Sequence, residues 1–438
     1  MIKASTVIAL AVILSTPVFA QEFLAIKSVN LIDGRTGTTN KNMTIILRGN
    51  RIISVGKANT IKIPPDAKVV DGAGRWAIPG LIDVHSHSKS RQVLQRALSL
   101  GVTTIHSMPS RPDTTLELEL WSSAPSNPSP RVLLTQWLFT AEFPGNISPT
   151  WAIVKPVTVD EARQGVERVR RDGFKHIKIF FDTGKLWFMD RPPTPNLNPE
   201  VLRAIIDRAH ELRLRVYAHA LEAALARQAV ESGVDALIHP VADTILTESF
   251  WTTIQKHATI WTTTLAVMEG LGNPPGFARC VLADARLRQV LSASAIQNYT
   301  RDTSATAFSS DTLFPAVRPN RIAYARTIVE NTKNAIKHGV TVALGSDQPA
   351  GIGTHIEMEL LQEAGLTPAQ IIVAATYGSS MALGMEEEIG TIEPRKWADI
   401  ALLSANPLAD IRNTRAVDMI IKGGQLYTQR ELLPSDNK

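Results

Sequence analysis

The residues best suited to chemistry lie in the segment Pro79–His87, where an apolar run ends in a His-x-His pair. Side chains two residues apart in a strand point to the same face, so His85 and His87 would present two imidazoles together. Imidazole nitrogen is a common ligand of zinc and other transition metals. Two histidines bonded only to their neighbours would give the same pattern, so the rest of the chain must decide.

Four further candidate ligands follow, each near the end of its own predicted strand: Lys178, His219, His239 and Asp347. Each alone has a simpler explanation, since a strand-end histidine usually packs, a lysine usually extends to solvent and an aspartate often caps a helix. Together, the four imidazoles and the carboxylate form a donor set suited to Zn²⁺, with Mn²⁺, Co²⁺ or Fe²⁺ as alternatives. A buried lysine among cations would be repelled unless its charge were removed.

The elements that must position these residues alternate between strand and helix. Helix-start signals at Thr158 and at Asn198-Pro199 fall between apolar strand candidates. Eight such units predict an α/β fold with a closed (β/α)8 TIM-type barrel, whose functional residues lie at the carboxyl ends of its strands. The predicted strands are Leu81–His87, Thr103–Met108, Arg131–Thr140, His176–Phe181, Arg215–His219, Ala236–Val241, Thr259–Val267 and Thr341–Asp347.

Both ends of the chain contain short strand-like runs that are too few to form a stable sheet alone. We therefore predict a small β-sandwich domain built from residues 21–79 and 388–438. The barrel would occupy residues 80–387. Weak periodicity around 270–319 predicts a partly helical insertion that could cover the barrel mouth.

The first 20 residues resemble a secretory signal peptide, with Lys3 before an apolar core and a small-x-small sequence ending at Ala20. The core is too short to span a bilayer, so we expect a periplasmic or secreted protein that leaves the membrane after cleavage. The net charge of +5 comes without a Lys/Arg run, which argues against a nucleic-acid partner. The single Cys280 excludes an intrachain disulfide.

Two segments, Pro79–His87 and Gly390–Ile400, together with the order His-x-His, Lys, His, His, Asp, resemble the amidohydrolase superfamily. The resemblance is to its imidazolonepropionase-like and prolidase-like branch, and it covers almost the whole chain after the leader. It implies a binuclear metal centre, most often containing Zn²⁺, and it is compatible with a homo-oligomer.

The resemblance also assigns roles to the ligands. The His-x-His pair would bind the more buried ion, and His219 and His239 would bind the second. Lys178 would carry a CO2-derived carbamate that bridges both ions, which removes the charge noted above. Asp347 would bind the first ion and handle the proton of the bridging hydroxide.

These observations favour an exported metal-dependent amidohydrolase that hydrolyses a C–N bond in an N-acyl amino acid, a dipeptide or a cyclic amide. Hydrolysis of a lactone, ester or phosphotriester at the same centre is the alternative among enzymes, with single-metal isomerisation or decarboxylation as a minor one. A catalytically inactive exported binding protein is the alternative of another class, which a missing ligand would have favoured.

Substrate identity depends on the loops after the strands. We expect His106, Tyr217 and His355 to contact a small-molecule substrate. The segment Phe180–Gly184 departs from the Ser-Gly-Gly of prolidase-like relatives, which weakens the case for a dipeptide. Aromatic and sulfur-containing residues near strands 3 and 4 suggest either an apolar substrate pocket or packing against the insertion: Trp137, Phe139, Trp187, Phe188 and Met189.

Overall fold

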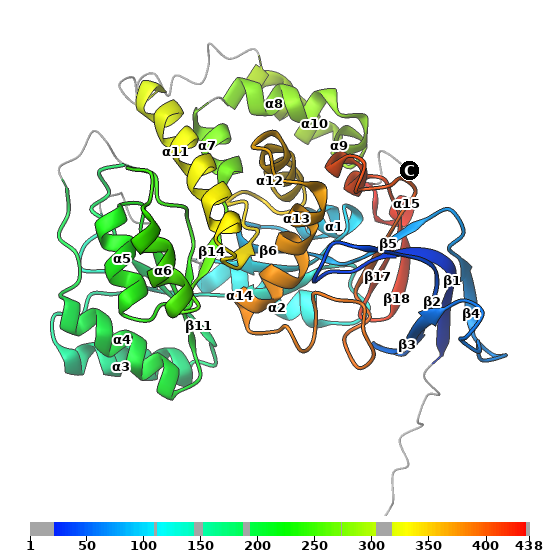
Figure 1. Cartoon of the computed structure of the whole chain (residues 1–438), viewed down its shortest axis with the longest axis horizontal. Helices are drawn as coiled ribbons and strands as arrows, with labels where there is room; N and C mark the ends of the chain where they lie inside the picture. Colours follow the sequence, from blue (N-terminus) through cyan, green and yellow to red (C-terminus); the bar gives the residue numbers. More distant parts are fainter. Residues whose placement is uncertain are drawn as a thin grey trace, which may run out of the picture.

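The computed structural model describes residues 22–108, 112–143, 152–186, 193–272, 274–303 and 318–434. These residues form an α/β protein with a mixed sheet built from both ends of the chain and two parallel sheets (Figure 1). The predicted leader, residues 1–20, lies outside the described residues. Among those described, no helix combines the length and apolar character needed to cross a membrane.

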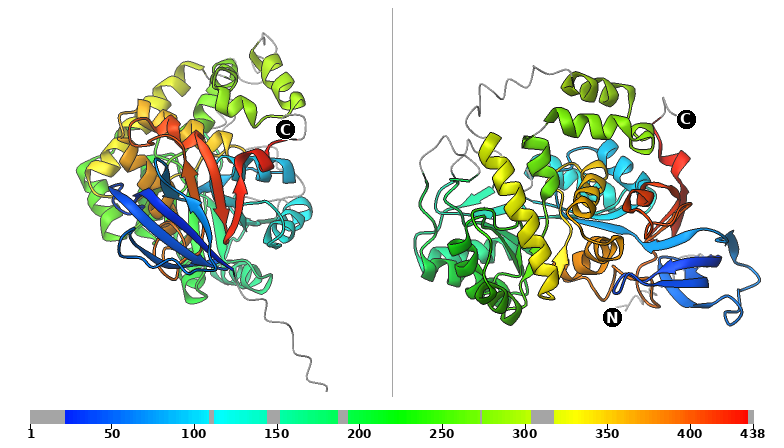
Figure 2. Two further views of the ribbon diagram at one scale, coloured as in Figure 1. Left: turned by 90° about the vertical axis from the view of Figure 1, so that its right-hand side faces the viewer. Right: turned by 45° about the horizontal axis from the view of Figure 1, so that its top comes forward.

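The mixed sheet joins the two ends of the chain. Its strand β5 pairs in parallel with β1 and antiparallel with β16, so that the carboxyl-terminal strands lie on one side of β5 and the other amino-terminal strands on the other side. Figure 2 shows the amino-terminal and carboxyl-terminal strands side by side. The strands are β1 (Phe23–Ile32), β2 (Thr39–Arg48), β3 (Arg51–Lys57), β4 (Lys68–Asp71), β5 (Trp76–Pro79), β16 (Ile400–Leu403), β17 (Val417–Lys422) and β18 (Gln425–Thr428).

The parallel strands contain the eight strand positions that the sequence predicts. They run β6-β7-β8 in one sheet and β10-β9-β11-β12-β13-β14-β15 in the other. Their bounds are β6 (Leu81–Ser86), β7 (Val102–Ser107), β8 (Arg131–Leu134), β9 (Trp137–Phe139), β10 (Ala152–Val154), β11 (His176–Phe180), β12 (Arg215–His219), β13 (Ala236–Leu237), β14 (Ile260–Thr262) and β15 (Val342–Ala343).

The third predicted strand is interrupted. Its first half, β8, pairs with β7, and its second half, β9, pairs with β11. At the other end of the strand order, the Val84 amide donates to the Leu344 carbonyl at 2.9 Å, and Ser86 bridges to Gln348. The segment that begins with the last strand therefore returns to lie beside the first strand.

Helices cover the outside of the parallel strands (Figure 1). The predicted start signals are confirmed, since Thr158 forms a capping box with Glu161 and Asn198 caps the helix that begins with Pro199. The helices are α1 (Arg91–Ser99), α2 (Pro112–Ser123), α3 (Val159–Arg171), α4 (Pro199–Glu211), α5 (Ala223–Glu231), α6 (Glu248–Lys256), α7 (Leu265–Gly272), α11 (Arg318–Lys337), α12 (Ile352–Glu363), α13 (Pro368–Val373), the π-helix η2 (Ala374–Gly378), α14 (Ser379–Leu383), the 3-10 helix η3 (Ile411–Arg415) and α15 (Gln429–Leu432).

The predicted insertion at 270–319 is mostly helical where the structure describes it. It contributes α8 (Pro274–Ala283), α9 (Ala285–Gln289) and α10 (Ala293–Thr303). Apolar side chains of α8 and α9 pack against α12 and against the residue that ends α1. These helices therefore rest on α1 and α12, as the right-hand view of Figure 2 shows from above.

The alternation of side chains in β11 fixes which of them face the interior. Ile177 and Ile179 pack outward into the apolar layer beneath the helices. Lys178 and Phe180 therefore point to the opposite face, into the space enclosed by the strands. This placement brings a lysine to the place where the neighbouring strands end in histidines.

Candidate metal centre

Three predicted ligands converge at the ends of β6 and β15. His85 Nε2 lies 3.2 Å and His87 Nε2 lies 2.7 Å from Oδ1 of Asp347. One ligand atom from each of the three residues lies within 4.8 Å of the other two, which is close enough for one metal ion. The His85 side chain is 3% exposed and that of His87 31%, so the group opens to solvent on the His87 side.

The backbone around Asp347 holds its carboxylate against the two imidazoles. The Asp347 amide donates to the His85 carbonyl at 2.7 Å, and its φ of +52° lies in the left-handed region that few non-glycine residues adopt. A Cβ at Gly345 would lie 2.9 Å from Cβ of His85, so only glycine lets this strand end pass so close. A strained, closely packed turn thus positions the acid.

The remaining two strand-end histidines continue the group. The ring centres of His85 and His239 lie 5.0 Å apart, and those of His239 and His219 lie 4.5 Å apart. His239 Nδ1 lies 2.9 Å from the Thr264 hydroxyl, which orients the ring. Four imidazoles from β6, β12 and the end of β13 thus form one continuous row.

Lys178 lies among these histidines. Its side chain is buried, and within the described residues its Nζ has no hydrogen-bond partner. Burial lowers the pKa of Lys178 to about 7, against the opposing charge of Asp347. Burial and the charge of Lys178 hold the pKa of His85 and of His219 well below the usual histidine value.

These properties fit a bound cation. Metal ions bind neutral imidazoles and carboxylates, and burial, which lowers the pKa of His85, His219 and His239, favours their neutral form. The unpartnered Nζ of Lys178 and the unpartnered Nδ1 of His85 are both buried, which costs free energy unless another group satisfies them. Nitrogen and oxygen donors of this kind suit Zn²⁺ and its first-row neighbours.

Asp83 was not predicted as a site residue from the sequence. Its hydrogen bonds hold the segments that carry His85 and Asp347 together. Its Oδ2 accepts hydrogen bonds from the Ser346 hydroxyl at 2.7 Å and the Thr354 hydroxyl at 2.8 Å. Its Oδ1 accepts from the amides of Ser346 and His85. Burial raises the pKa of Asp83 to about 6, although these hydrogen bonds oppose the shift. Two residues before His85, it joins β6 to the segment that contains Asp347.

Two other buried carboxylates join neighbouring elements near the histidines. Asp182 accepts from the amides of Gly184 and Leu221 at 2.8 and 2.7 Å, which ties the end of β11 to the end of β12. Glu357 of α12 accepts from the Ala266 amide at 2.6 Å, at the start of α7. Burial raises the pKa of each carboxyl to about 7.

Two of the three predicted substrate contacts lie inside the ring of strands. The Tyr217 hydroxyl donates to the Ala382 carbonyl at 2.8 Å and is buried, so its expected substrate contact is wrong. His106 is also buried, and its Nε2 lies 2.7 Å from the Thr135 hydroxyl. Its ring packs against His176 and Tyr217. His106 therefore packs among the strands, and its expected contact with substrate stays a prediction.

His355 is also buried away from the place that its predicted contact with substrate requires. Its Nε2 lies 2.8 Å from the Leu100 carbonyl, and its Nδ1 lies 3.1 Å from the Thr414 hydroxyl. Burial lowers the pKa of His355 to about 3. With both nitrogens occupied between α1, α12 and η3, it has a structural role instead of the predicted contact with substrate.

The aromatic residues of strand 3 pack away from the centre. Trp137 lies under the guanidinium of Arg168, 4.5 Å from its ring centre, and Phe139 packs with Val166 of the same helix α3. They belong to the layer between strands and helices, which agrees with the packing interpretation. The other residues considered for the pocket, 187–189, lie outside the described residues.

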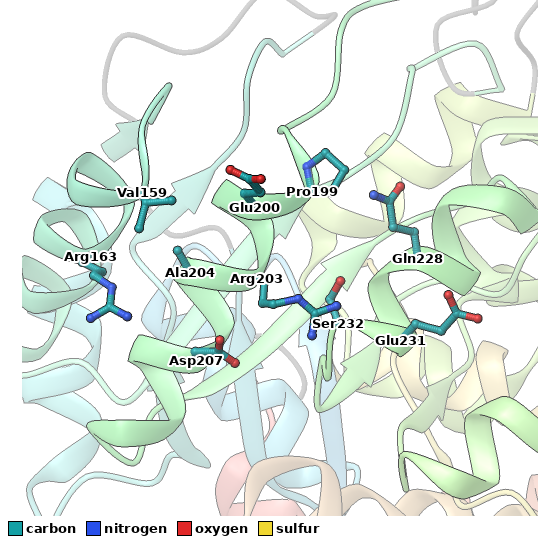
Figure 3. A pocket seen from close by; sticks show the side chains of 10 residues that line it. All are labelled: Val159, Arg163, Pro199, Glu200, Arg203, Ala204, Asp207, Gln228, Glu231 and Ser232. Atoms are coloured by element: carbon teal, nitrogen blue, oxygen red, sulfur yellow. The ribbon is translucent and has the colours of Figure 1, made fainter.

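A groove of about 450 Å³ lies between α3, α4 and α5 (Figure 3). Its lining includes Arg163, Arg203, Asp207 and Glu231. Charges of both signs line it, and none of the candidate ligands does. It is separate from the metal centre.

With this geometry in view, the comparisons with known proteins identify the family. Residues 76–427 match the model of the Amidohydrolase family. The chain belongs to the amidohydrolase family.

Two relatives illustrate how the amidohydrolase chain aligns. It is 27% identical over 275 residues to the ochratoxinase of Aspergillus niger, an alignment that covers 61% of this chain and 49% of the ochratoxinase. The chain therefore spans about half the length of that relative. It is 24% identical over 371 residues to the imidazolonepropionase of Symbiobacterium thermophilum, which covers 82% of each chain.

The fold is also shared with solved structures. A Xaa-Pro dipeptidase with bound methionine in its active site superposes with a TM-score of 0.74 at 20% identity, covering 93% of this chain and all of the other. The family match confirms the resemblance to the amidohydrolases, and the solved structure shows that the fold is shared.

Proposed function

We propose that this chain is a metal-dependent hydrolase that cleaves the C–N bond of an amide or peptide-like substrate at a centre of two divalent ions. One observation carries the proposal. The ends of separate parallel strands bring four imidazoles, a lysine and a carboxylate to one place. Burying so many polar and ionisable side chains together costs free energy, which bound metal ions would offset. The family relationship also supports a metal-dependent hydrolase.

The residues divide between the two ions as follows. His85, His87 and Asp347 would hold the first ion, and His219 and His239 the second. Lys178, carboxylated by CO2, would be shared by both. Its buried amine favours this modification because the neutral form of an amine is the one that reacts with CO2. Zn²⁺ is the metal that we expect.

Two divalent ions held here would polarise the scissile carbonyl and make water a stronger nucleophile. We assign the proton transfer to Asp347, because a carboxylate that holds an ion through one oxygen has a second oxygen able to accept a proton. Its carboxylate accepts a proton from the attacking water and delivers it to the departing nitrogen. Hydrolysis then yields a carboxylic acid and an amine.

We also infer that the parallel strands and their helices form a (β/α)8 barrel over residues 80–387, with the terminal sheet as a separate small domain. The return of the last strand to the first supports this architecture. For the leader at residues 1–20 we propose export to the periplasm or beyond. The expected partner is a small-molecule substrate, with neither nucleic acid nor membrane bound.

The test begins with elemental analysis of the purified protein in bicarbonate, followed by assays with N-acyl amino acids, dipeptides and lactones. We expect about two divalent ions per chain and turnover of amides in preference to lactones. Asp347→Asn should lower kcat by at least 100-fold, whereas Asp66→Asn, an exposed carboxylate in a loop of the terminal sheet, should not. A protein that takes up no metal on reconstitution would overturn the proposal and favour a binding module.

A further inference from the structure

Two phenylalanine rings extend outward from His219, one of the proposed metal ligands. The rings of Phe180 and His219 are stacked, with centres 4.5 Å apart and planes inclined by 23°. Phe143 packs on Phe180 in turn, with its ring centre 4.9 Å away. Phe180 is buried and Phe143 is partly exposed, so the row leads from the centre to solvent.

Strand register explains why Phe180 lies beside a ligand. Phe180 is the register partner of His219, and Lys178 is the partner of Leu138. Partners in neighbouring parallel strands share a face, and so do residues two apart in one strand. Lys178 and Phe180 therefore point to the same interior, with Phe180 nearer the carboxyl end of the strand, where a substrate would enter.

The two sides of the centre differ in polarity. On the side of β6 and β15 lie the partly exposed His87 and the carboxylate of Asp347. On the side of β11 lie the rings of Phe180 and Phe143. A substrate that places its scissile bond at the centre thus meets polar groups on one side and hydrocarbon on the other.

We propose that Phe180 and Phe143 form an apolar subsite that receives an aromatic or branched aliphatic group attached directly to the scissile amide. The inference rests on the proposed function and narrows it to amides with a bulky apolar substituent. Burying such a group against two rings favours it over a methyl group by roughly 10- to 100-fold in kcat/KM.

Phe143 is the residue to change, because Phe180 packs on a proposed ligand and its loss would disturb the centre itself. The assay compares kcat/KM for N-phenylacetylglycine and N-acetylglycine, and for N-acetylphenylalanine and N-acetylalanine. We expect the wild type to prefer the aromatic member of at least one pair. Phe143→Ala should lower that preference at least 10-fold, and Phe143→Leu should retain most of it.

Phe23→Ala is the matched control, since Phe23 is also partly exposed and packs against an arginine in the terminal sheet. It should leave the preference unchanged. Metal content should be the same in all variants, which shows that the centre is intact. A preference that is unaffected or increased by Phe143→Ala would overturn the subsite.

A second readout separates this inference from the proposed function. Calorimetry with phenylacetate and acetate measures the subsite without any turnover. If the wild type hydrolyses none of the four amides but binds phenylacetate more tightly in a Phe143-dependent way, the proposed function fails and the apolar subsite stands. If amides are hydrolysed without a Phe143-dependent preference in rates or binding, the subsite fails alone.

Discussion

The Ser346 hydroxyl donates to Asp83 at 2.7 Å, and both residues are fully buried. This bond joins the strand that ends in His85 to the turn that contains Asp347. The same carboxylate also accepts from Thr354 at the start of α12. The separation between the two ligands is therefore set by a carboxylate that would not itself touch the metal.

Ser346→Ala removes one of these bonds and leaves part of Asp83 unsatisfied. We expect the free energy of unfolding to fall by about 1–3 kcal/mol, because a buried acceptor loses its partner. Metal affinity should fall by about 10-fold or more, as the ligands are less well oriented. Urea denaturation and metal titration measure the two effects. Ser123→Ala, an exposed hydroxyl at the end of α2, should change neither.

Lys178→Ala tests the bridge between the two proposed ions. We expect one of the two ions and more than about 99% of the turnover to be lost, since no other described side chain takes its place. Elemental analysis and steady-state kinetics report these losses, and added short carboxylates should restore part of the activity. Lys175→Ala, an exposed residue just before the same strand, serves as control. A variant with two ions and full turnover would refute the carbamate.

Glu357→Gln tests the buried carboxyl of α12. Its pKa of about 7 lies above the unfolded value, so the folded protein holds this proton over a pH range in which the unfolded chain has lost it. The contribution of Glu357 to stability is therefore complete at about pH 4 and is lost as the pH rises through 7. The loss amounts to about 3 kcal/mol.

Denaturation of wild type and Glu357→Gln from about pH 4.5 to 8 measures this loss. The wild type should lose stability relative to the variant across that range, because glutamine keeps the acceptor for the Ala266 amide without becoming charged. Parallel curves for the two proteins would show that Glu357 does not titrate in this window.

Tyr217→Phe tests the correction made to the predicted substrate contacts. The lost hydrogen bond to Ala382 should cost about 1 kcal/mol of unfolding free energy. Both kcat and KM should stay within about twofold of the wild type, because the hydroxyl does not reach the metal centre. Steady-state kinetics that instead show substrate affinity weakened by about an order of magnitude would reinstate Tyr217 as a substrate contact.

The strands and their terminal histidines could be predicted because both leave a strong pattern. Buried parallel strands appear as short apolar runs, and a polar residue at the end of such a run is conspicuous, as at His219. The interruption of strand 3 could not be predicted, since Arg131–Thr140 is apolar in most of its length and only pairing with two different neighbours divides it.

The failures at individual side chains have a common cause. Alternation places Tyr217 on the inner face of its strand, but it does not tell whether the ring extends toward the mouth or toward Ala382 at the other end. Similarly, His355 follows the predicted strand Thr341–Asp347, but the sequence does not tell which neighbours its ring contacts. The position of Phe180 beside the centre could have been predicted, because it lies two residues after Lys178 in the same predicted strand and therefore shares its face.

The terminal sheet has a consequence for biosynthesis. Strand β5 leaves the ribosome early, but its partner β16 begins roughly 320 residues later, a delay of about 15–60 s at ordinary translation rates. Until then the nascent sheet has an open edge, the kind of surface that recruits other chains. A chain truncated before Ile400 keeps that edge permanently, so premature termination should yield aggregates rather than a folded barrel lacking a tail.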